Sequence, residues 1–218
     1  MNIDINKKSS LLTDELRSQL KDVLSRIESK VTLATVIDGE NEKSTELLDL
    51  AIDIASLSDK LEVIAYEKGE DTGFEEKIHA DKFPVLSLLN SNGDYSGVKF
   101  HGVPGGHELN SFILAIYNLA GPSQNLNPAT IESIKAIDKN LNIKVCISQS
   151  CHLCPDVVVA TQRIAIENPN IETEMVDVMD FKDIRKKFKI MSVPAIIIND
   201  EVVKFGSKSI EEIIDLIK

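Results

Sequence analysis

The feature that most constrains the fold is an internal repeat, with a period of about a hundred residues. In the first half, "VTLATVID" (31–38) and "LEVIAYEK" (61–68) have the pattern of strands, and the amphipathic "NEKSTELLDLAIDIASL" between them predicts a helix. The second half repeats this order with "NIKVCIS", "CPDVVVATQRIAIEN" and "IETEMVDV". Each half therefore predicts a strand–helix–strand unit, and the period is too long for a solenoid.

Each unit continues with a predicted hairpin and a closing helix. In the first half, a polar stretch is followed by "FPVLSLLN", the turn "SNGD", "GVKFHG" and a helix over about 106–119; in the second, a short helix "DFKDIRKKF" is followed by "VPAIIIND", "EVVKF" and the helix "SIEEIIDLIK". A leading helix precedes each unit, with Thr13 and Asn127 as N-caps, and the second runs from Pro128 to about 140. Crossovers give parallel strands and hairpins give antiparallel ones, so we expect an α/β fold in which mixed sheets are flanked by helices.

The segment "GPSQNLNP" (121–128) interrupts the repeat with glycine, two prolines and polar residues. We interpret it as a linker. The sequence therefore predicts two domains, 1–121 and 122–218.

Composition excludes several classes of function. The net charge of −11 and the lack of a basic run argue against binding to nucleic acid or to anionic membranes. The N-terminal sequence lacks the apolar core of a signal peptide, and no apolar run approaches the roughly 20 residues that span a bilayer. Three cysteines without a secretory signal fit a reducing compartment, so we expect a cytoplasmic protein.

The chemistry is concentrated in "SQSCHLCPDVV" (148–158), which places Cys151 and Cys154 at the start of a predicted helix. The unpaired N–H groups and the dipole of a helix N-terminus stabilise an anion, so we expect Cys151 to ionise near neutral pH. Cys154, one turn into the helix, is expected to be buried and to resolve mixed disulfides. Pro155 falls in the first turn, where its missing N–H costs little.

A structural zinc site needs four ligands. The remaining candidates (Cys146, His79, His101, His107 and His152) show no second pair at ligand spacing, so a redox couple is favoured over a metal site. Cys146, on a predicted strand, is expected to be a small core residue.

His152 lies between the two cysteines and has two interpretations. A partly charged imidazole would stabilise the thiolate and make the couple more oxidising. Alternatively, His152 faces solvent and has little effect.

The second half resembles thioredoxin folds. Pro194 in "SVPA" follows Cys151 by 43 residues and matches the cis-proline loop that faces the disulfide in those folds. The resemblance implies that this loop bars metal capture and that Val193 offers its backbone to a partner's peptide. In the first half the same offset from Pro84 leads to Asn41, and residues 1–145 contain no cysteine. That half is either a packing scaffold or a wall of the cleft around Cys151.

"HGVPGGHELNSF" (101–112) is the candidate for such a wall, since it places His107 and Glu108 in the first turn of a helix. A carboxylate there can accept a proton or shift the pKa of the dithiol, or it can simply complement the helix dipole. The chain contains neither GxxxxGK[ST] nor a GxGxxG after a strand, so we expect no nucleotide cofactor in it. Its electrons must come from elsewhere.

"SCHLCPDVV" and "FHGVPGGHELNSFILAIYNL" together resemble the N-terminal domain of the F component of alkyl hydroperoxide reductase, over essentially the whole chain. The resemblance implies two tandem thioredoxin-like folds and a dithiol–disulfide oxidoreductase. A flavoprotein portion related to thioredoxin reductase would pass electrons from NADH through FAD to the couple, and the couple would reduce a peroxiredoxin, the C component of the same reductase. It also implies that Cys151 is the interchange thiol, Cys154 its partner and Glu108 the nearby acid.

Other interpretations stay open. Archaeal-type protein disulfide oxidoreductases are also tandem folds and often carry a second couple, which the first half lacks. Glutaredoxins share the "SVP" loop, but "FGSKS" stands where they have glycines and an acid. The functional alternatives are a free-standing reductase of general protein disulfides and a non-catalytic interaction module.

Overall fold

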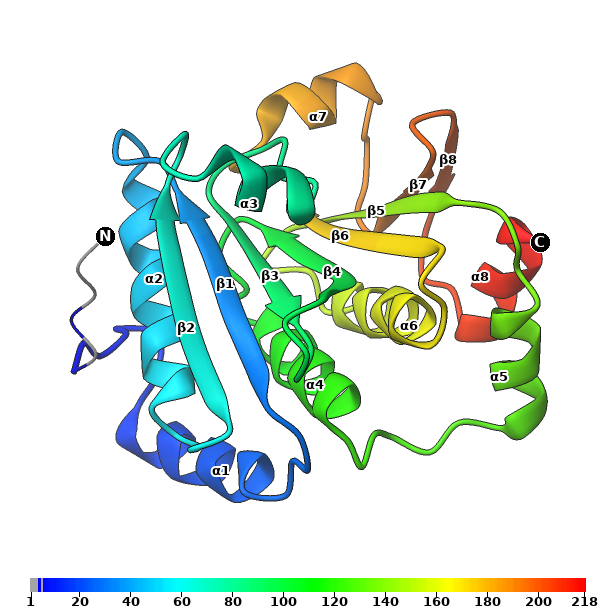
Figure 1. Ribbon diagram of the computed structural model, residues 1–218. Helices are drawn as coiled ribbons and strands as arrows, with labels where there is room; N and C mark the ends of the chain where they lie inside the picture. Colours follow the sequence, from blue (N-terminus) through cyan, green and yellow to red (C-terminus); the bar gives the residue numbers. More distant parts are fainter. Residues whose placement is uncertain (1–3, 5) are drawn as a thin grey trace.

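The computed structural model describes residue 4 and residues 6–218, so residues 1–3 and 5 of the predicted first domain lie outside the described part. The described residues form one eight-stranded sheet in the order β2-β1-β3-β4-β6-β5-β7-β8 (Figure 1). Its strands are β1 Val31–Ile37, β2 Leu61–Glu67, β3 Val85–Leu89, β4 Tyr95–His101, β5 Leu141–Ile147, β6 Ile171–Asp177, β7 Ala195–Ile198 and β8 Val202–Phe205.

Helices flank this sheet, which confirms the predicted α/β class. They are α1 Asp14–Leu24, α2 Glu42–Ala55, α3 Thr72–Lys77, α4 Glu108–Ala120, α5 Pro128–Lys135, α6 Cys154–Glu167, α7 Lys182–Lys187 and α8 Ile210–Ile217. Both predicted N-caps are confirmed: the Thr13 side chain accepts a hydrogen bond from the Leu16 N–H, and the Asn127 side chain from the Ala129 N–H.

Two helices differ from the sequence prediction. The polar stretch after β2 contains α3, a six-residue helix capped by Asp71, whose side chain accepts from the Phe74 N–H. The second leading helix, expected to reach about residue 140, ends at Lys135. It stops there because the buried Asn168 side chain donates hydrogen bonds to the carbonyls of Ile134 (2.7 Å) and Ile137 (2.9 Å), at the helix end.

The two halves are joined by the parallel pairing of β4 with β6, in which Phe100 lies opposite Met175. Within each half, one pair of strands is parallel (β1 with β2, β5 with β6) and the hairpin is antiparallel. The expected sheets of the two halves are thus one continuous sheet.

The main apolar core lies on the face covered by α2, α4 and α6 (Figure 1). Helices α4 and α6, one from each half, contact each other across this face. Phe100 and Phe112 meet edge to face, with ring centroids 5.3 Å apart, a contact that adds about 1 kcal/mol to the burial of the two rings. One core therefore serves both halves.

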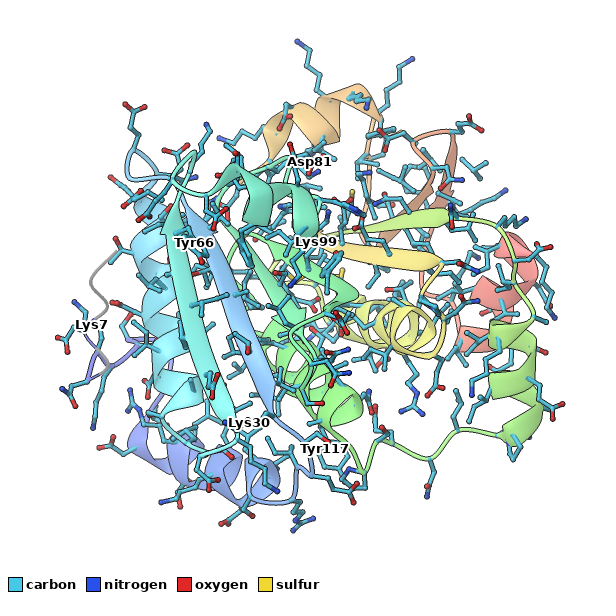
Figure 2. The ribbon with its side chains drawn as sticks, viewed as in Figure 1. Lys7, Lys30, Tyr66, Asp81, Lys99 and Tyr117 are labelled. Atoms are coloured by element: carbon cyan, nitrogen blue, oxygen red, sulfur yellow. A yellow bond between two sulfur atoms is a disulfide. The ribbon has the colours of Figure 1, made fainter. Side chains whose placement is uncertain are left out.

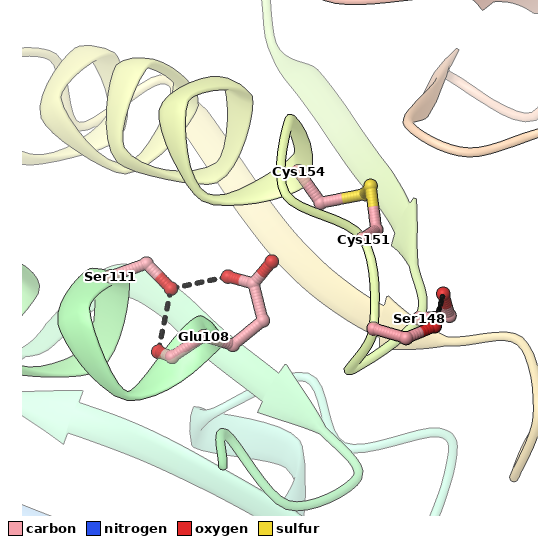
Figure 3. Close-up of a disulfide and its surroundings, with 6 residues drawn as sticks. Glu108, Ser111, Ser148, Cys151 and Cys154 are labelled. Carbon is pink, nitrogen blue, oxygen red and sulfur yellow. Dashed lines mark hydrogen bonds between the residues drawn. A yellow bond between two sulfur atoms is a disulfide. The ribbon is translucent and has the colours of Figure 1, made fainter. Parts of the chain in front are cut away.

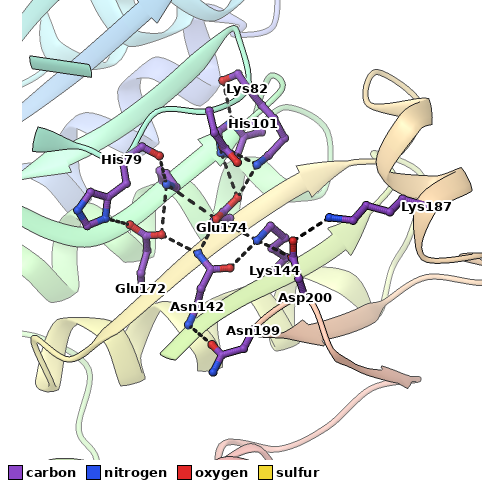
Figure 4. Close-up of polar contacts among 12 residues, drawn as sticks. His79, Lys82, His101, Asn142, Lys144, Glu172, Glu174, Lys187, Asn199 and Asp200 are labelled. Atoms are coloured by element: carbon purple, nitrogen blue, oxygen red, sulfur yellow. Dashed lines mark hydrogen bonds and ion pairs between the residues drawn. The ribbon is translucent and has the colours of Figure 1, made fainter. Parts of the chain in front are cut away.

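The other face of β4, β6 and β5 carries a polar network (Figure 4). Lys99, labelled in Figure 2, is buried there, with its Nζ 3.3 Å from Glu172 Oε1 and 3.8 Å from Glu174 Oε1. Glu174 is also paired with three further cationic or titratable groups: Lys82 Nζ at 3.1 Å, His101 Nε2 at 3.2 Å and Lys144 Nζ at 3.5 Å. Burial alone would raise the pKa of the Glu174 carboxyl, but the contacts with His101, Lys99 and Lys82 hold it well below its usual range. The network thus crosses the junction between the halves as an ionised cluster.

Across residue 4 and residues 6–218, no helix combines the length and apolar character that crossing a membrane requires.

Candidate active site

Cys151 and Cys154 form a disulfide at the carboxyl end of β5, with an S–S distance of 2.09 Å and Cα atoms 5.5 Å apart (Figure 3). The prediction that Cys154 lies one turn into the helix is wrong: α6 begins at Cys154, with Leu153 as the N-cap. A tight turn comes before it, in which the Cys151 N–H donates to the Ser148 carbonyl (2.9 Å). Pro155 occupies the first turn as expected. Both sulfurs therefore lie at the amino end of α6.

The two cysteines differ in exposure, as predicted. Cys154 is fully buried, while Cys151 is half-buried and the adjacent His152 and Leu153 are exposed. An incoming sulfur can therefore reach Cys151 but not Cys154. This asymmetry suits a couple in which one thiol exchanges with a partner and the other completes the reaction.

The cis-proline loop has the predicted geometry at its proline. The Val193–Pro194 peptide is cis, and Val193 packs against the same apolar cluster as Cys151. The Pro194 carbonyl accepts from the Gly206 N–H (2.9 Å). The backbone N–H and carbonyl of Val193 form no hydrogen bond to another residue in the described part of the chain. They are free to pair with a partner's peptide.

The first half has an equivalent cis-proline loop, but one of its own side chains occupies the backbone acceptor of that loop. The Phe83–Pro84 peptide is also cis. Asn41, at the position equivalent to Cys151, caps α2 by accepting from the Lys43 N–H, and its Nδ2 donates to the Phe83 carbonyl (3.4 Å). The backbone acceptor that corresponds to the one on Val193 is therefore already occupied.

Glu108 projects from the start of α4, in the first half, toward the disulfide of the second half (Figure 3). Its side chain is fully buried; Oε2 accepts a short hydrogen bond from the Ser111 hydroxyl, and Oε1 has no hydrogen-bond partner among the described residues. Burial raises the pKa of Glu108 to about 7, against the opposing effect of Ser111. A carboxyl group that can hold or release a proton at neutral pH thus faces the couple.

The loop before Glu108 docks on the segment that carries the cysteines. Gly106 has φ of +55°, and a Cβ at this position would lie 3.1 Å from the Gln149 carbonyl oxygen, so both conformation and space favour glycine. Gln149 in turn donates from Nε2 to the Val103 carbonyl (3.3 Å). The exposed rings of His107 and His152 lie with centroids 4.1 Å apart. The sequence indicated each histidine separately, but gave no signal for their contact.

The other titratable candidates lie outside the couple. Cys146 is buried in the core and free, and burial raises the pKa of its thiol to about 12, which makes it unreactive at neutral pH. Among the described residues, the group whose ligand atoms converge as a metal site would is Asp81, His101 and Glu174, which contains no cysteine. Lysines already neutralise Glu174 there, so the group is better explained as part of the polar network.

The comparisons with known proteins agree with this geometry. The family described as Thioredoxin domain matches residues 141–218. The F component of alkyl hydroperoxide reductase from Pseudomonas putida is 35% identical over 204 residues, which cover 94% of this chain. The same region covers 37% of that protein, so the chain spans little more than a third of the length of the curated relatives it matches.

Solved structures match the whole chain. A mutant of the alkylhydroperoxide reductase AhpF of Enterococcus faecalis (V583) has a TM-score of 0.92 at 39% identity, covering 96% of this chain and 100% of that one. The crystal structure of the NTD_N/C domain of the same reductase has a TM-score of 0.91 at 40% identity and covers 95% and 100% of the two chains. A protein disulfide oxidoreductase from Aeropyrum pernix has a TM-score of 0.86 at 24% identity, covering 99% and 93%, and so shares the fold.

The tandem thioredoxin-like fold is thereby established, with the Cys151–Cys154 disulfide in the second half and Glu108 contributed by the first. By sequence and structure together, the chain belongs to the family of the N-terminal domain of the alkyl hydroperoxide reductase AhpF.

Proposed function

We propose that the chain is a dithiol–disulfide oxidoreductase that relays electrons from a flavoprotein disulfide reductase to the disulfide of a peroxiredoxin. The observation that carries the proposal is the site itself: a half-buried Cys151, bonded to a buried Cys154, beside the unpaired backbone of Val193. The resemblance of the whole chain to AhpF proteins supports the choice of partners.

The forward step begins with both cysteines reduced. The Cys151 thiolate, favoured by the amino end of α6, attacks one sulfur of the partner's disulfide and releases the other sulfur as a thiolate. Cys154 then loses its proton and attacks Cys151 Sγ, which releases the partner's second thiolate and forms the disulfide seen here. Two electrons pass to the partner, whose two released thiolates take up protons from solvent.

We propose that Glu108 accepts the proton that Cys154 loses in the second step. Cys154 is buried and needs an acceptor for its proton, and the buried Glu108, whose Oε1 has no partner among the described residues, projects toward the disulfide (Figure 3). With a pKa of about 7, the group accepts this proton and returns it during re-reduction. Pro155, Pro194 and Val193 hold the geometry, while His107 and His152 modulate the thiolate.

Re-reduction of the Cys151–Cys154 disulfide requires a second protein or a further portion of a longer one. The matching region is 37% of the length of the curated relatives, and we infer that FAD and NADH act on a flavoprotein portion related to thioredoxin reductase. We keep 1–121 and 122–218 as the proposed domains, the first shaping the site and the second carrying the couple. We also propose a cytoplasmic location, where disulfides are usually transient and catalytic.

A rate comparison tests the relay. The pre-reduced protein is mixed with the oxidised peroxiredoxin and, separately, with insulin, and disulfide reduction is followed by rapid mixing. The proposal predicts rapid transfer to the peroxiredoxin, slow transfer to insulin, and no transfer by Cys151→Ser. The reverse order of rates would favour a general protein disulfide reductase, which is the alternative function.

A further inference from the structure

Next to Val193, the surface contains a hollow of about 120 Å³ that the redox chemistry does not use. Its walls come from the turn before the cysteines, the loop after β6, helix α7 and the cis-proline loop; they include Ser148, Met179, Arg185, Ile190, Met191 and Val193. The hollow therefore lies within one or two residues of the position where a partner's peptide would pair with Val193.

The rim of the hollow is apolar and exposed. The Met191 side chain is 82% exposed and that of Met179 is 54% exposed, while Ile190 is buried beneath them. Exposed apolar side chains grouped beside a reactive centre mark a surface that another molecule covers. Methionine is flexible and polarisable, and adapts to apolar side chains of different shape.

Arg185 is the charged residue that lines the hollow, and helix α7 around it is rich in cations. Helix α7 and the residue two positions after it carry five cations and one carboxylate: Lys182, Arg185, Lys186, Lys187, Lys189 and Asp183. Lys187 is paired with Asp200 (2.9 Å), whereas Arg185 and Lys186 form no ion pair within residues 6–218. In a chain of net charge −11, this local excess of cations favours an acidic ligand.

The equivalent positions of the first half supply an internal comparison. Helices α3 and α7 occupy the same place in the two repeats, and the aligned positions of Met179, Arg185 and Met191 are held by Gly69, Glu75 and Asp81. Neither the exposed methionines nor the positive charge is present there. Exposed methionines and positive charge therefore occur together beside the Val193–Pro194 loop, whose backbone is free. They do not occur beside the Phe83–Pro84 loop, whose backbone carbonyl accepts from Asn41.

We propose that this hollow, which we name the methionine hollow, binds the partner segment that carries the disulfide. The segment is an extended acidic peptide: an apolar side chain next to the reacting cysteine inserts between Met179 and Met191, and a neighbouring carboxylate faces Arg185. The inference rests on the proposed exchange reaction at Cys151 and adds the chemistry by which a partner is selected.

The test uses the full reduced chain and three synthetic peptides, each with its cysteine in a mixed disulfide with 5-thio-2-nitrobenzoate. The sequences are Glu-Leu-Cys-Leu-Glu, Lys-Leu-Cys-Leu-Lys and Gly-Gly-Cys-Gly-Gly. Cys151 attacks the peptide sulfur, the coloured thiolate leaves because it is the weaker base, and Cys154 then displaces the peptide. Release of colour gives the rate, which is divided by the rate of the same peptide with dithiothreitol.

The acidic peptide should react about tenfold faster than the basic one at low salt, and the ratio should shrink at high salt. Arg185→Glu should abolish or invert this preference, whereas Arg26→Glu, the same change at an exposed position just after α1, should leave it intact. The double change Met179→Ala and Met191→Ala should remove the preference for leucine over glycine.

Equal normalised rates for the three peptides, or the same ratios in Arg185→Glu and Arg26→Glu, would overturn the methionine hollow as the selecting site. Failure of the exchange reaction itself has a different signature. In that case even the glycine peptide would react no faster with the wild type than with Cys151→Ser.

Discussion

Glu108 links the buried environment of the site to a pH dependence of stability. Its pKa is raised by burial from 4.5 to about 7, so the folded state holds a proton that the unfolded state has already released. The stability due to this group is fully present below the unfolded pKa and is lost as the pH rises through the folded one. The penalty at slightly alkaline pH is at most about 3 kcal/mol.

Glu108→Gln should therefore be more stable than the wild type at pH about 8, by up to about 3 kcal/mol, and similar to it at pH about 4.5. Urea unfolding of the oxidised proteins at both pH values measures this difference, with the exposed Glu132→Gln as the control. A difference that is the same at both pH values would mean that the buried carboxyl does not titrate as described.

The contact between His107 and His152 carries a second prediction at this scale. His152 is adjacent in sequence to the half-buried Cys151, and its ring lies 4.1 Å from that of His107, so a positive charge on His152 would stabilise the thiolate. His152→Ala should lower the reduction potential by about 10–30 mV, because the reduced form loses this stabilisation. Equilibration with a glutathione buffer measures the shift, and the exposed His79→Ala is the control. An unchanged potential in His152→Ala would leave the histidine as a solvent-facing residue.

At the scale of elements, periodicity predicted all eight strands of the described sheet and the long helices, because most of them bury several residues. The edge strand β8 buries none, and it was indicated by its β-branched residues after the turn at Asn199 and Asp200. Helix α3 was missed because its six residues bury only Phe74 and include Gly73, a poor helix former, whereas the equally short α7 contains no glycine. The comparison with α7 could have revealed it, since the two helices are equivalent in the repeat. The early end of α5 depends on Asn168, which is distant in sequence and follows a different helix.

The Asn168 side chain leads to a prediction about the end of helix α5. Asn168→Ala removes the buried side-chain donor of the Ile134 carbonyl and leaves the Ile137 carbonyl with a longer hydrogen bond from Asn170 Nδ2 (3.3 Å), which should destabilise the protein by about 1–3 kcal/mol. The exposed Asn140→Ala, near the same helix end, should have little effect. Chemical unfolding of both variants measures this. Equal stability of the two would show that water replaces the amide without cost.

At the scale of the whole molecule, the sequence predicted two similar halves but not how they join. The pairing of β4 with β6 is a contact between strands that each look complete within their own repeat. One signal was present: Lys99, His101, Glu172 and Glu174 alternate with apolar residues on these strands, which marks a polar face. Periodicity could not predict which side chains pair on that face or that Glu108 lies opposite Cys151. Both depend on how the two halves join into one sheet.

The polar network at this junction predicts a large effect for its central residue. Glu174 contacts groups from both halves, so Glu174→Ala removes the carboxylate that Lys82, Lys99 and Lys144 share and leaves each lysine with one partner, Asp81, Glu172 and Asp200 respectively. The loss should be about 3 kcal/mol, at the lower end of the cost of removing one partner from a buried ion cluster. The loss is measured by urea unfolding, with the exposed Glu62→Ala, whose partner is Lys30, as the control. A loss no larger than that of the control would mean that the network contributes nothing to joining the halves.

The central claim is that Cys151 exchanges with the disulfide of a peroxiredoxin and that Cys154 completes the transfer. Cys154→Ser, reduced and mixed with the oxidised peroxiredoxin, tests it most directly, because the first mixed disulfide can no longer be resolved from within this chain. The account predicts that a covalent complex accumulates and that mass spectrometry of its proteolytic peptides joins Cys151 to a peroxiredoxin cysteine. No complex in Cys154→Ser, or an equal yield of complex through Cys154 in Cys151→Ser, would contradict it.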